Sequence, residues 1–359
     1  LDDAAARGAV FCEALAAVQV SGALGHVATE LHEAIVEALD AQGGARQCYE
    51  FEGKAFRASA LARVLEGPLL RERHVEEVRE LCANASAASL TPTERELASG
   101  MWTTSQLRTA LALLRVCGVV AVEGILPARL LAEVATASAA EHHRQGDATR
   151  TDAASRGSMR REVKLPLKPP FTDERLTQDP LLLSLVKLFV GDRAELDTFS
   201  GIRSDPGSKD QVWHNDAPVP HVRSDTDPLV GVVAVVPLAN ASTASGPTSF
   251  LAGSHVDMGD ERFWVGDDDG DGASDVTPKL AFPARVGSVV LFDLRLRHRG
   301  GANRAAEARP ILYMSYVQDW FKDATNFKEP QTRAWDDLSP AGRRLFARLD
   351  ARQYLRSVE

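Results

Sequence analysis

Three segments with the character of β-strands, all in the second half of the chain, constrain the fold most. Residues 230–238 form a continuous apolar run, which predicts a strand buried on both faces. Residues 285–293 are rich in strand-forming residues after the turn-prone Gly287, and residues 309–317 form a third such segment. These strands, with a glycine-containing turn among them, predict a mainly β fold with flanking helices. The specific expectation is a double-stranded β-helix, the jelly-roll or cupin-like barrel.

Helices and further strands are expected before residue 230. The periodicity of apolar residues predicts helices over residues 106–114, 127–143 and 179–189, and strands over residues 118–122 and 195–203. These elements are short and alternate along the chain. We therefore expect one barrel domain over residues 101–359.

The first hundred residues predict a separate helical region. Apolar residues recur at helical spacing in residues 26–39, 57–65 and 75–81. Another helix is expected to start with Thr91 at the N-cap and Pro92 in the first turn. Residues 1–100 contain no group with recognisable chemistry, so we expect them to pack against the barrel or to face a partner.

Two histidines and one aspartate are the candidate metal ligands. His214 and Asp216 lie two residues apart, so they share a face if that segment is extended. Alternation continued from residues 285–293 places His298 on the same face as Phe292, with Arg295 on the opposite, solvated face. Two imidazoles and one carboxylate can occupy one triangular face of an octahedral metal and leave the other open. This is the ligand set of non-haem Fe(II) oxygenases.

Arg309 adds a charge to the same inner face. It lies eleven residues after His298 and shares its strand face with Ile311, Tyr313 and Ser315. A buried arginine needs an anion, and its planar fork fits a carboxylate. Taken singly, each of these residues has a structural explanation, as a loop pair, a strand-end histidine or half of a salt bridge. Their order, spacing and strand context together favour an Fe(II)/2-oxoglutarate oxygenase.

The segment from about residue 213 to residue 318 resembles the phytanoyl-CoA dioxygenase family of Fe(II)/2-oxoglutarate oxygenases. The motifs are Trp-His-Asn-Asp at 213–216, Gly-Pro-Thr-Ser-Phe-Leu-Ala-Gly-Ser-His at 246–255, Gly-Ser-Val-Val-Leu-Phe-Asp at 287–293, His-Arg-Gly at 298–300 and Arg-Pro at 309–310. The resemblance implies that His214, Asp216 and His298 bind iron. It also implies that Arg309 grips the distal carboxylate of 2-oxoglutarate, and Thr248 is a further candidate for binding this co-substrate.

The chain departs from the family pattern at one position, and other histidines compete for a role. Ala252 stands where a proline is common before Gly-Ser-His, which alters a turn but no chemistry. By resemblance His255 belongs to this turn and not to the metal, although a role as ligand is an alternative. His221 either lines the cleft or lies in a solvated loop. Asp216 is present, which disfavours halogenation, because halogenating relatives replace this carboxylate with a small residue.

The resemblance implies a particular reaction. Fe(II) would be the cofactor, with 2-oxoglutarate and O2 as co-substrates. Oxidative decarboxylation to succinate and CO2 would be coupled to hydroxylation of an aliphatic C–H bond in a small-molecule substrate, with desaturation or cyclisation as alternatives. Two other classes stay open: a cupin-like metal enzyme that does not use 2-oxoglutarate, and a non-catalytic jelly-roll binding protein. Arg309 at the inner face of the barrel speaks against the first, and the complete ligand set speaks against the second.

Residues outside these motifs carry weaker signals. The cationic residues Arg203, Lys209 and Arg223 either flank an entrance and attract an anion or are plain surface charge. Residues 267–275 match an Asp-rich calcium-loop pattern but lack a glutamate at the twelfth position, so we expect an acidic surface loop near the site. The substrate and the oligomeric state are left open.

Composition and charge limit the partners and the location. A net charge of −9 without a basic stripe argues against nucleic acid as the main partner. No segment is expected to span a membrane, since the longest apolar stretch, residues 110–126, is interrupted by Arg115 and Glu123. The four cysteines are scattered without metal-ligand spacing, which predicts buried thiols in a reducing compartment. We expect an intracellular, cytoplasmic protein, with organelle targeting left open because the chain begins at Leu1.

Overall fold

The computed structural model describes residues 73–145, 159–216, 230–256, 278–321 and 337–349. Two compact units divide the chain, Leu1–His74 and Val75–Glu359, and the described residues belong almost entirely to the second. The helices expected over residues 26–39 and 57–65 lie outside the described residues. Residues 73–81 are helical, which confirms the helix expected over residues 75–81.

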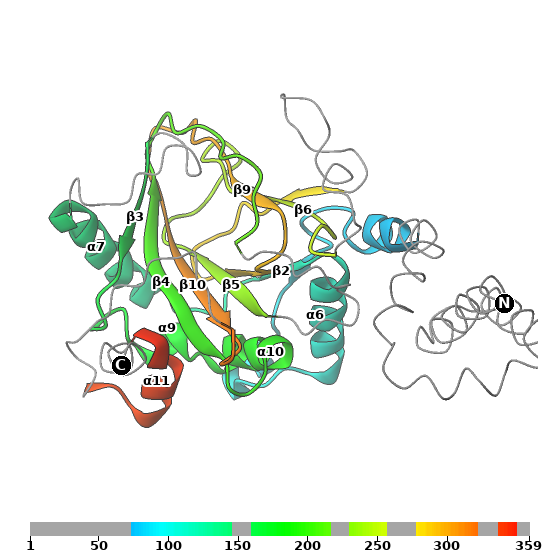
Figure 1. Ribbon diagram of the computed structural model, residues 1–359, viewed down its shortest axis with the longest axis horizontal. Coiled ribbons are helices and arrows are strands. Elements are labelled where there is room, and N and C mark those ends of the chain that lie inside the picture. Colours follow the sequence, from blue (N-terminus) through cyan, green and yellow to red (C-terminus); the bar gives the residue numbers. More distant parts are fainter. Residues whose placement is uncertain (1–72, 146–158, 217–229, 257–277, 322–336, 350–359) are drawn as a thin grey trace, which may run out of the picture. The chain divides into compact units, whose positions relative to one another are not determined.

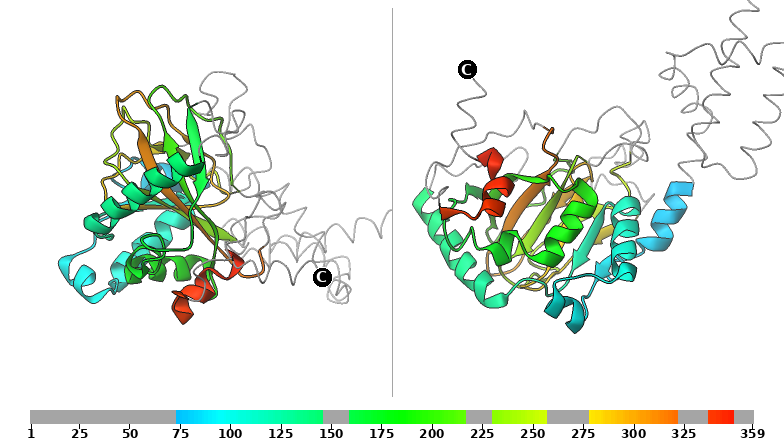
Figure 2. Two further views of the ribbon diagram at one scale, coloured as in Figure 1. Left: turned by 90° about the vertical axis from the view of Figure 1, so that its left-hand side faces the viewer. Right: turned by 90° about the horizontal axis from the view of Figure 1, so that it is seen from below.

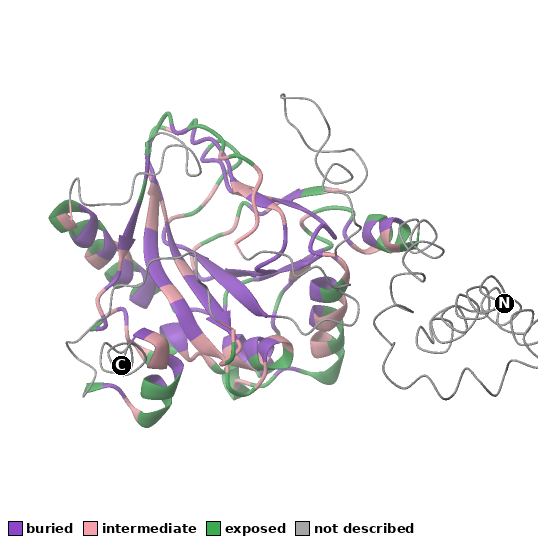
Figure 3. Cartoon of the chain, in the orientation of Figure 1, coloured by how far each residue is buried: buried purple, intermediate pink, exposed green. Residues whose placement is uncertain are grey.

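The main sheet has seven strands (Figure 1). Their order across the sheet is β1 (Ser89–Leu90), β2 (Val119–Val122), β8 (Val289–Asp293), β5 (Gly231–Pro237), β10 (Arg309–Val317), β4 (Glu195–Ser204) and β3 (Arg160–Lys164). The β1–β2 pair is parallel and every other pair is antiparallel. Strand β5 lies in the middle and is buried along its whole length (Figure 3), as its uninterrupted apolar sequence predicted.

A second sheet of three strands faces the candidate site. It consists of β7 (Lys279–Ala281), β6 (Thr248–Leu251) and β9 (His298–Gly300) in that order. The chain passes from β8 in the main sheet to β9 in the second sheet through a turn at residues 294–297. The continuous strand expected from Val290 to His298 is therefore wrong, because the chain changes sheets at this point. Arg295, expected in solvent, is only 2% exposed.

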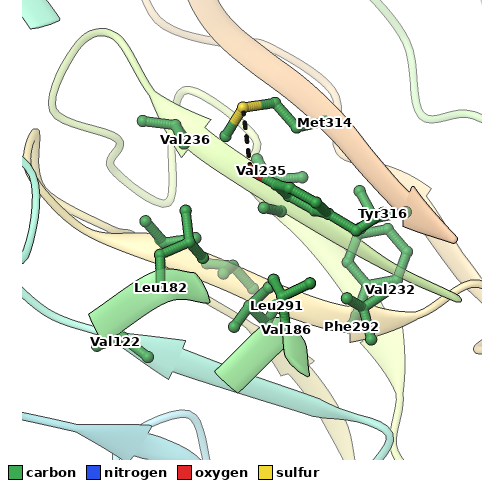
Figure 4. Packing of buried hydrophobic residues seen from close by; sticks show 14 of the residues in the cluster. Val122, Leu182, Val186, Val232, Val235, Val236, Leu291, Phe292, Met314 and Tyr316 are labelled. Atoms are coloured by element: carbon green, nitrogen blue, oxygen red, sulfur yellow. Dashed lines mark hydrogen bonds between the residues drawn. The ribbon is translucent and has the colours of Figure 1, made fainter. Parts of the chain in front are cut away.

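Helices cover the main sheet. Their bounds are α5 (Glu94–Ser99), α6 (Thr104–Val116), α7 (Ala128–Gln145), α9 (Glu174–Thr177), α10 (Pro180–Val190) and α11 (Pro340–Leu345), followed by the 3₁₀ turn η4 (Ala347–Leu349). Helix α10 packs on β5 and β10, α6 on β2, α7 on β3 and α11 on β4 (Figure 2). In Figure 4, Leu182 and Val186 of α10 lie against Val232 and Leu291 of the sheet. None of the described helices has both the length and the apolar character needed to cross a bilayer.

Most of the expected elements are present with small shifts of their ends. The helices at 106–114, 127–143 and 179–189 correspond to α6, α7 and α10. The expected cap at Thr91 is wrong, because α5 starts two residues later, with Thr93 at the N-cap. The Thr93 hydroxyl accepts the backbone N–H of Glu96 at 3.2 Å, and the Glu96 carboxylate accepts the backbone N–H of Thr93 at 2.9 Å. This reciprocal capping box fixes the start of the helix at Thr93, although Thr91 also has a glutamate, Glu94, three residues after it.

A disulfide corrects the expectation of free thiols. Cys82, just after the helix at residues 73–81, is bonded to Cys117 at the end of α6, and both residues are fully buried. Cys12 and Cys48 lie outside the described residues. The inference of a reducing compartment loses its support, since disulfides persist mainly in oxidising environments. Sequence spacing could not reveal the pair, because folding brings together residues 35 positions apart.

We expect this disulfide to contribute about 3–4 kcal/mol to the free energy of unfolding, because it closes a loop of this length in the unfolded chain. The double substitution Cys82→Ala/Cys117→Ala should lower the unfolding free energy, measured in urea without reductant, by about this amount. An unfolding free energy of the double variant equal to that of the wild type would contradict the prediction.

Candidate functional site

The structure brings His214, Asp216 and His298 together in one cluster. One ligand atom from each residue lies within 4.8 Å of the others. The Nε2 atom of His298 lies 3.4 Å from Oδ2 of Asp216, and Nε2 of His214 lies 3.9 Å from Oδ1 of the same carboxylate. Among the described residues, this is the one group of three or more histidine, cysteine or acidic side chains with metal-binding spacing.

Backbone pairing places the two histidines side by side. His214 and His298 form an isolated antiparallel bridge, in which each backbone N–H donates to the other residue's carbonyl oxygen, at 3.0 and 2.8 Å. Each ring then uses Nδ1 locally: His214 contacts the carbonyl oxygen of Val212 and His298 that of Leu296, both at 2.9 Å. A donor role for Nδ1 leaves Nε2 unprotonated in the neutral ring. Both imidazoles are therefore oriented with a lone pair available for a metal.

The environment of His298 keeps its ring neutral. The ring packs against Phe292, with ring centres 4.6 Å apart, and lies near Phe250. Burial lowers the pKa of His298 to about 4, and the nearby His214 acts in the same direction, although Asp216 opposes the shift. A neutral imidazole is the form that binds metals.

Tyr313 of β10 holds the carboxylate of Asp216. Its hydroxyl donates a hydrogen bond to Oδ2 of Asp216, while the backbone N–H of Asp216 donates to the carbonyl oxygen of Leu294 at 2.9 Å. The aspartate is thus held at both its backbone and its side chain. Partners of this kind commonly orient metal-binding groups and tune their affinity.

We expect Tyr313→Phe to weaken Fe(II) binding by about 10-fold or more, because loss of an outer hydrogen-bond partner typically costs 10–100-fold in metal affinity. Tyr316→Phe is the matched control: it lies on the same strand, but its hydroxyl bonds the carbonyl oxygen of Thr177 at 3.3 Å, away from the site. Metal affinity measured by anaerobic titration should change in the first variant only. A similar loss in both would indicate a general effect on the strand.

Arg309 lies at the other end of the site with a second arginine. Cross-strand register aligns Arg160 of β3 and Arg309 of β10 on either side of Ser204 of β4. The Ser204 hydroxyl oxygen accepts from Nε of Arg160 at 2.9 Å and from Nη2 of Arg309 at 3.0 Å. Both arginines are buried, and Nε of Arg309 has no hydrogen-bond partner among the described residues. Two buried cations side by side favour an anionic ligand.

Burial and the neighbouring charge also affect the titration of Arg309. Its pKa falls to about 9, first because of desolvation and then because of repulsion by Arg160. At neutral pH the guanidinium is still charged. A carboxylate bound beside it would relieve both effects, since it supplies the opposite charge and hydrogen-bond acceptors.

These groups line one cavity of about 270 Å³. Its walls come from both sheets: the candidate ligands and Arg309 line it together with Thr248 of β6 and residues of β3, β4, β5 and β8. The inward positions of β10 are Arg309, Ile311, Tyr313 and Ser315, which are the residues that strand alternation placed on one face. The cavity is large enough for small molecules bound next to the clustered histidines.

Other expected residues lie elsewhere. His255 is buried and its Nε2 lies 3.0 Å from the carbonyl oxygen of Arg115, outside the His-Asp-His cluster. Arg203 pairs with Asp205 at 2.6 Å, and Lys209 is an exposed residue beside a shallow surface hollow. His221, Arg223 and the acidic segment 267–275 lie outside the described residues.

Sequence reasoning missed Arg160 on the cavity wall, Ser204 as the partner of both arginines, and Tyr313 as the partner of Asp216. Strand alternation placed Tyr313 on the face of Arg309 but did not indicate its bond to Asp216, and it gives no information on Arg160 and Ser204. Their positions depend on the pairing of β3, β4 and β10. Ser204 of β4 and Arg309 of β10, for example, are more than 100 residues apart in the sequence. Register between distant strands was not accessible from the sequence.

Comparison with known proteins gives a family match. The model of the phytanoyl-CoA dioxygenase family matches residues 114–311. A curated relative, the dioxygenase af480 of Aspergillus fumigatus, is 26% identical over 171 residues, which cover 47% of this chain and 52% of that protein. The match thus spans about half the length of that relative.

Two solved structures align with part of this chain. AviO1 from Streptomyces viridochromogenes Tue57 aligns with a TM-score of 0.47 and 20% identity, over 62% of this chain and all (100%) of that chain. The non-haem α-ketoglutarate-dependent epimerase SnoN from nogalamycin biosynthesis aligns with a TM-score of 0.49 and 20% identity, over 64% and 92% of the two chains.

Proposed function

This chain belongs to the phytanoyl-CoA dioxygenase family, and we propose that it is an Fe(II)- and 2-oxoglutarate-dependent oxygenase that hydroxylates an aliphatic C–H bond of a small molecule. The family uses Fe(II), with 2-oxoglutarate and O2 as co-substrates. The observation that carries the proposal is one cavity that holds a His-Asp-His cluster together with a buried arginine.

The donor set fits iron. Two imidazole Nε2 atoms and one carboxylate form the ligand set of non-haem Fe(II) enzymes, which leaves positions open for other ligands. In the proposed centre His214, Asp216 and His298 hold the metal. The backbone bridge between the two histidines and the Tyr313 hydroxyl keep the three ligand atoms oriented before the metal arrives.

The cation at the far end of the cavity fits 2-oxoglutarate. Nε of Arg309 is buried and has no partner among the described residues, so an incoming carboxylate would satisfy it and neutralise part of the charge. The Ser204 hydroxyl orients Arg309 by accepting a hydrogen bond from its Nη2 atom, and Arg160 adds a second positive charge. Thr248 lines the same cavity and is proposed to contribute a hydroxyl to this ligand.

When bound, iron would allow O2 to oxidise both 2-oxoglutarate and the substrate: one oxygen atom would enter succinate as CO2 is released, and the other would enter the hydroxylated product. The protein itself positions the co-substrate and the substrate and excludes water from the cavity. Arg309 fixes one end of the co-substrate, and the apolar residues Ile311, Val235 and Phe292 shield the cavity wall between that end and the metal ligands. Substrate held beside the ligands then reacts in a protected space.

For the fold and domains we propose a double-stranded β-helix whose two halves are the seven-stranded and three-stranded sheets. We also propose an N-terminal helical region ahead of the oxygenase domain. The boundary moves from residue 100 to the neighbourhood of Val75, because β1 pairs with β2 and Cys82 is bonded to Cys117.

Succinate formation from 2-oxoglutarate tests the proposal. The purified full chain with Fe(II), ascorbate and O2 should form succinate, slowly without substrate and faster with the correct one, and Asp216→Ala should form none. Succinate formation that persists in Asp216→Ala would contradict the metal site. No turnover with any small-molecule library would favour a metal enzyme without 2-oxoglutarate or a binding protein.

A further inference from the structure

The turn between β8 and β9 contacts two of the three proposed ligands through its carbonyl groups. The carbonyl oxygen of Leu294 accepts the backbone N–H of Asp216 at 2.9 Å. The carbonyl oxygen of Leu296 lies 2.9 Å from Nδ1 of the His298 ring. The backbone position of Asp216 and the orientation of the His298 ring therefore depend on the conformation of this short segment.

A buried ion pair spans the same turn. Nε of Arg295 donates to Oδ1 of Asp293 at 2.9 Å and Nη2 donates to Oδ2 at 2.7 Å. The backbone N–H of Arg295 also donates to Oδ1 at 2.8 Å, and that of Leu296 donates to the carbonyl oxygen of Asp293 at 2.9 Å. The Arg295 and Asp293 side chains are 3% and 0% exposed. The charged pair and the backbone bonds close the turn together.

The turn is also tied to the main sheet. The backbone N–H of Asp293 donates to the carbonyl oxygen of Gly118, just before β2, at 2.9 Å. The backbone N–H of Leu294 donates to the carbonyl oxygen of Gly231, the first residue of β5, at 3.2 Å. The ion pair therefore links rigid strands on one side to the ligand-holding carbonyls on the other.

Stability alone is a poor explanation for this pair. Two charges lose their hydration on burial, and replacing a buried ion pair with apolar residues of similar volume is often neutral or stabilising. What the pair provides is direction, because a bidentate arginine–carboxylate contact has a fixed planar geometry. Such a contact suits a segment whose carbonyl groups must occupy fixed positions.

We propose that Asp293 and Arg295 are positioning residues of the metal centre. Their ion pair holds the 293–296 turn so that Asp216 and His298 present their ligand atoms to the same point. The inference rests on the proposed Fe(II) site and adds to it two residues that touch neither the metal nor the co-substrate.

The test is a titration of the full chain with Co(II), a spectroscopic probe for the site, in wild type, Arg295→Met and Arg295→Lys. We expect about 10–100-fold weaker Co(II) affinity in Arg295→Met, the usual range for loss of an outer-shell partner, and a changed visible absorption spectrum. Arg295→Lys keeps the charge but loses the fork, so its affinity should lie between those of wild type and Arg295→Met.

Two controls separate positioning from general destabilisation. Arg175→Met breaks a bidentate pair of the same spacing, with Asp173, at 3.0 and 2.7 Å on α9. Leu131→Ala opens the core in α7, and its melting temperature serves as a stability reference. Both control proteins should bind Co(II) like the wild type and keep its spectrum.

Each outcome decides the matter. Wild-type affinity and spectrum in Arg295→Met, or an equal loss in Leu131→Ala, would overturn the positioning role. If Arg295→Met does not fold, Arg295→Lys decides by the same criteria. His298→Ala separates the two proposals. If this variant binds Co(II) like the wild type, the proposed metal site is wrong. If it loses Co(II) binding while Arg295→Met binds normally, only the positioning role is refuted.

Discussion

Replacing Arg309 by alanine should weaken 2-oxoglutarate binding by roughly two to four powers of ten. Removing one partner of a buried charge pair typically costs about 3–5 kcal/mol, and each 1.4 kcal/mol is about a tenfold change in binding. The effect should be large here because Arg309 is 5% exposed and the bound pair would be poorly screened by water. Affinity for Fe(II) without 2-oxoglutarate should stay close to that of the wild type, since Arg309 is not among the clustered ligand atoms.

Arg309→Lys should recover only part of the lost affinity. An ammonium keeps the charge, but it cannot donate two parallel hydrogen bonds to one carboxylate or keep the planar contact with Ser204. The measurement is anaerobic titration with 2-oxoglutarate in the presence of Fe(II), with metal affinity followed separately. Arg304→Ala, an exposed arginine on the same segment, is the matched control. An unchanged 2-oxoglutarate affinity in Arg309→Ala would refute the co-substrate assignment even if the iron site is correct.

Substitution of any proposed ligand should abolish iron-dependent turnover. His214→Ala, Asp216→Ala and His298→Ala each leave two donors, which bind Fe(II) poorly. We expect an affinity loss of at least about 100-fold, because loss of an outer-shell partner alone costs 10–100-fold. Metal content after dialysis, Fe(II) titration and succinate formation measure the three effects.

His255→Ala is the matched control for His298→Ala. The two histidines are almost equally buried, at 3% and 5% exposure, but His255 bonds the carbonyl oxygen of Arg115 away from the cluster. Its replacement should lower stability and leave metal affinity unchanged when the comparison is made on folded protein. Turnover that survives in two of the three ligand variants would show that the ligands are assigned wrongly.

Local sequence pattern predicted most elements of the sheet domain. The apolar run at 230–238 corresponds to β5, and the amphipathic spacing at 106–114 to α6. These predictions succeed because period-two and period-3.6 patterns reflect contacts of residues near in sequence. The prediction of a continuous strand from Val290 to His298 was wrong for the same reason. The alternating pattern continues in the sequence, whereas the chain turns at residues 294–297 and enters another sheet.

The residue types of the candidate site were also accessible from the sequence. His214, Asp216, His298 and Arg309 stand in motifs whose order and spacing predict their convergence, and the structure places all four around one cavity. Their chemistry depends on side-chain identity, which a sequence states directly. The buried environment that keeps His298 neutral could be inferred only in outline from the apolar residues around it.

Tertiary structure alone decided the supports of the site. The pairing of β3, β4 and β10 aligns Arg160 and Ser204 with Arg309, and the change of sheet after β8 buries Arg295 against Asp293. The disulfide between Cys82 and Cys117 likewise depends on packing. The sequence by itself determined which groups can hold a metal and a carboxylate, because these are properties of single residues and short motifs. Which residues orient them was decided by strand register and chain reversal, because these arise from contacts between segments far apart in the chain.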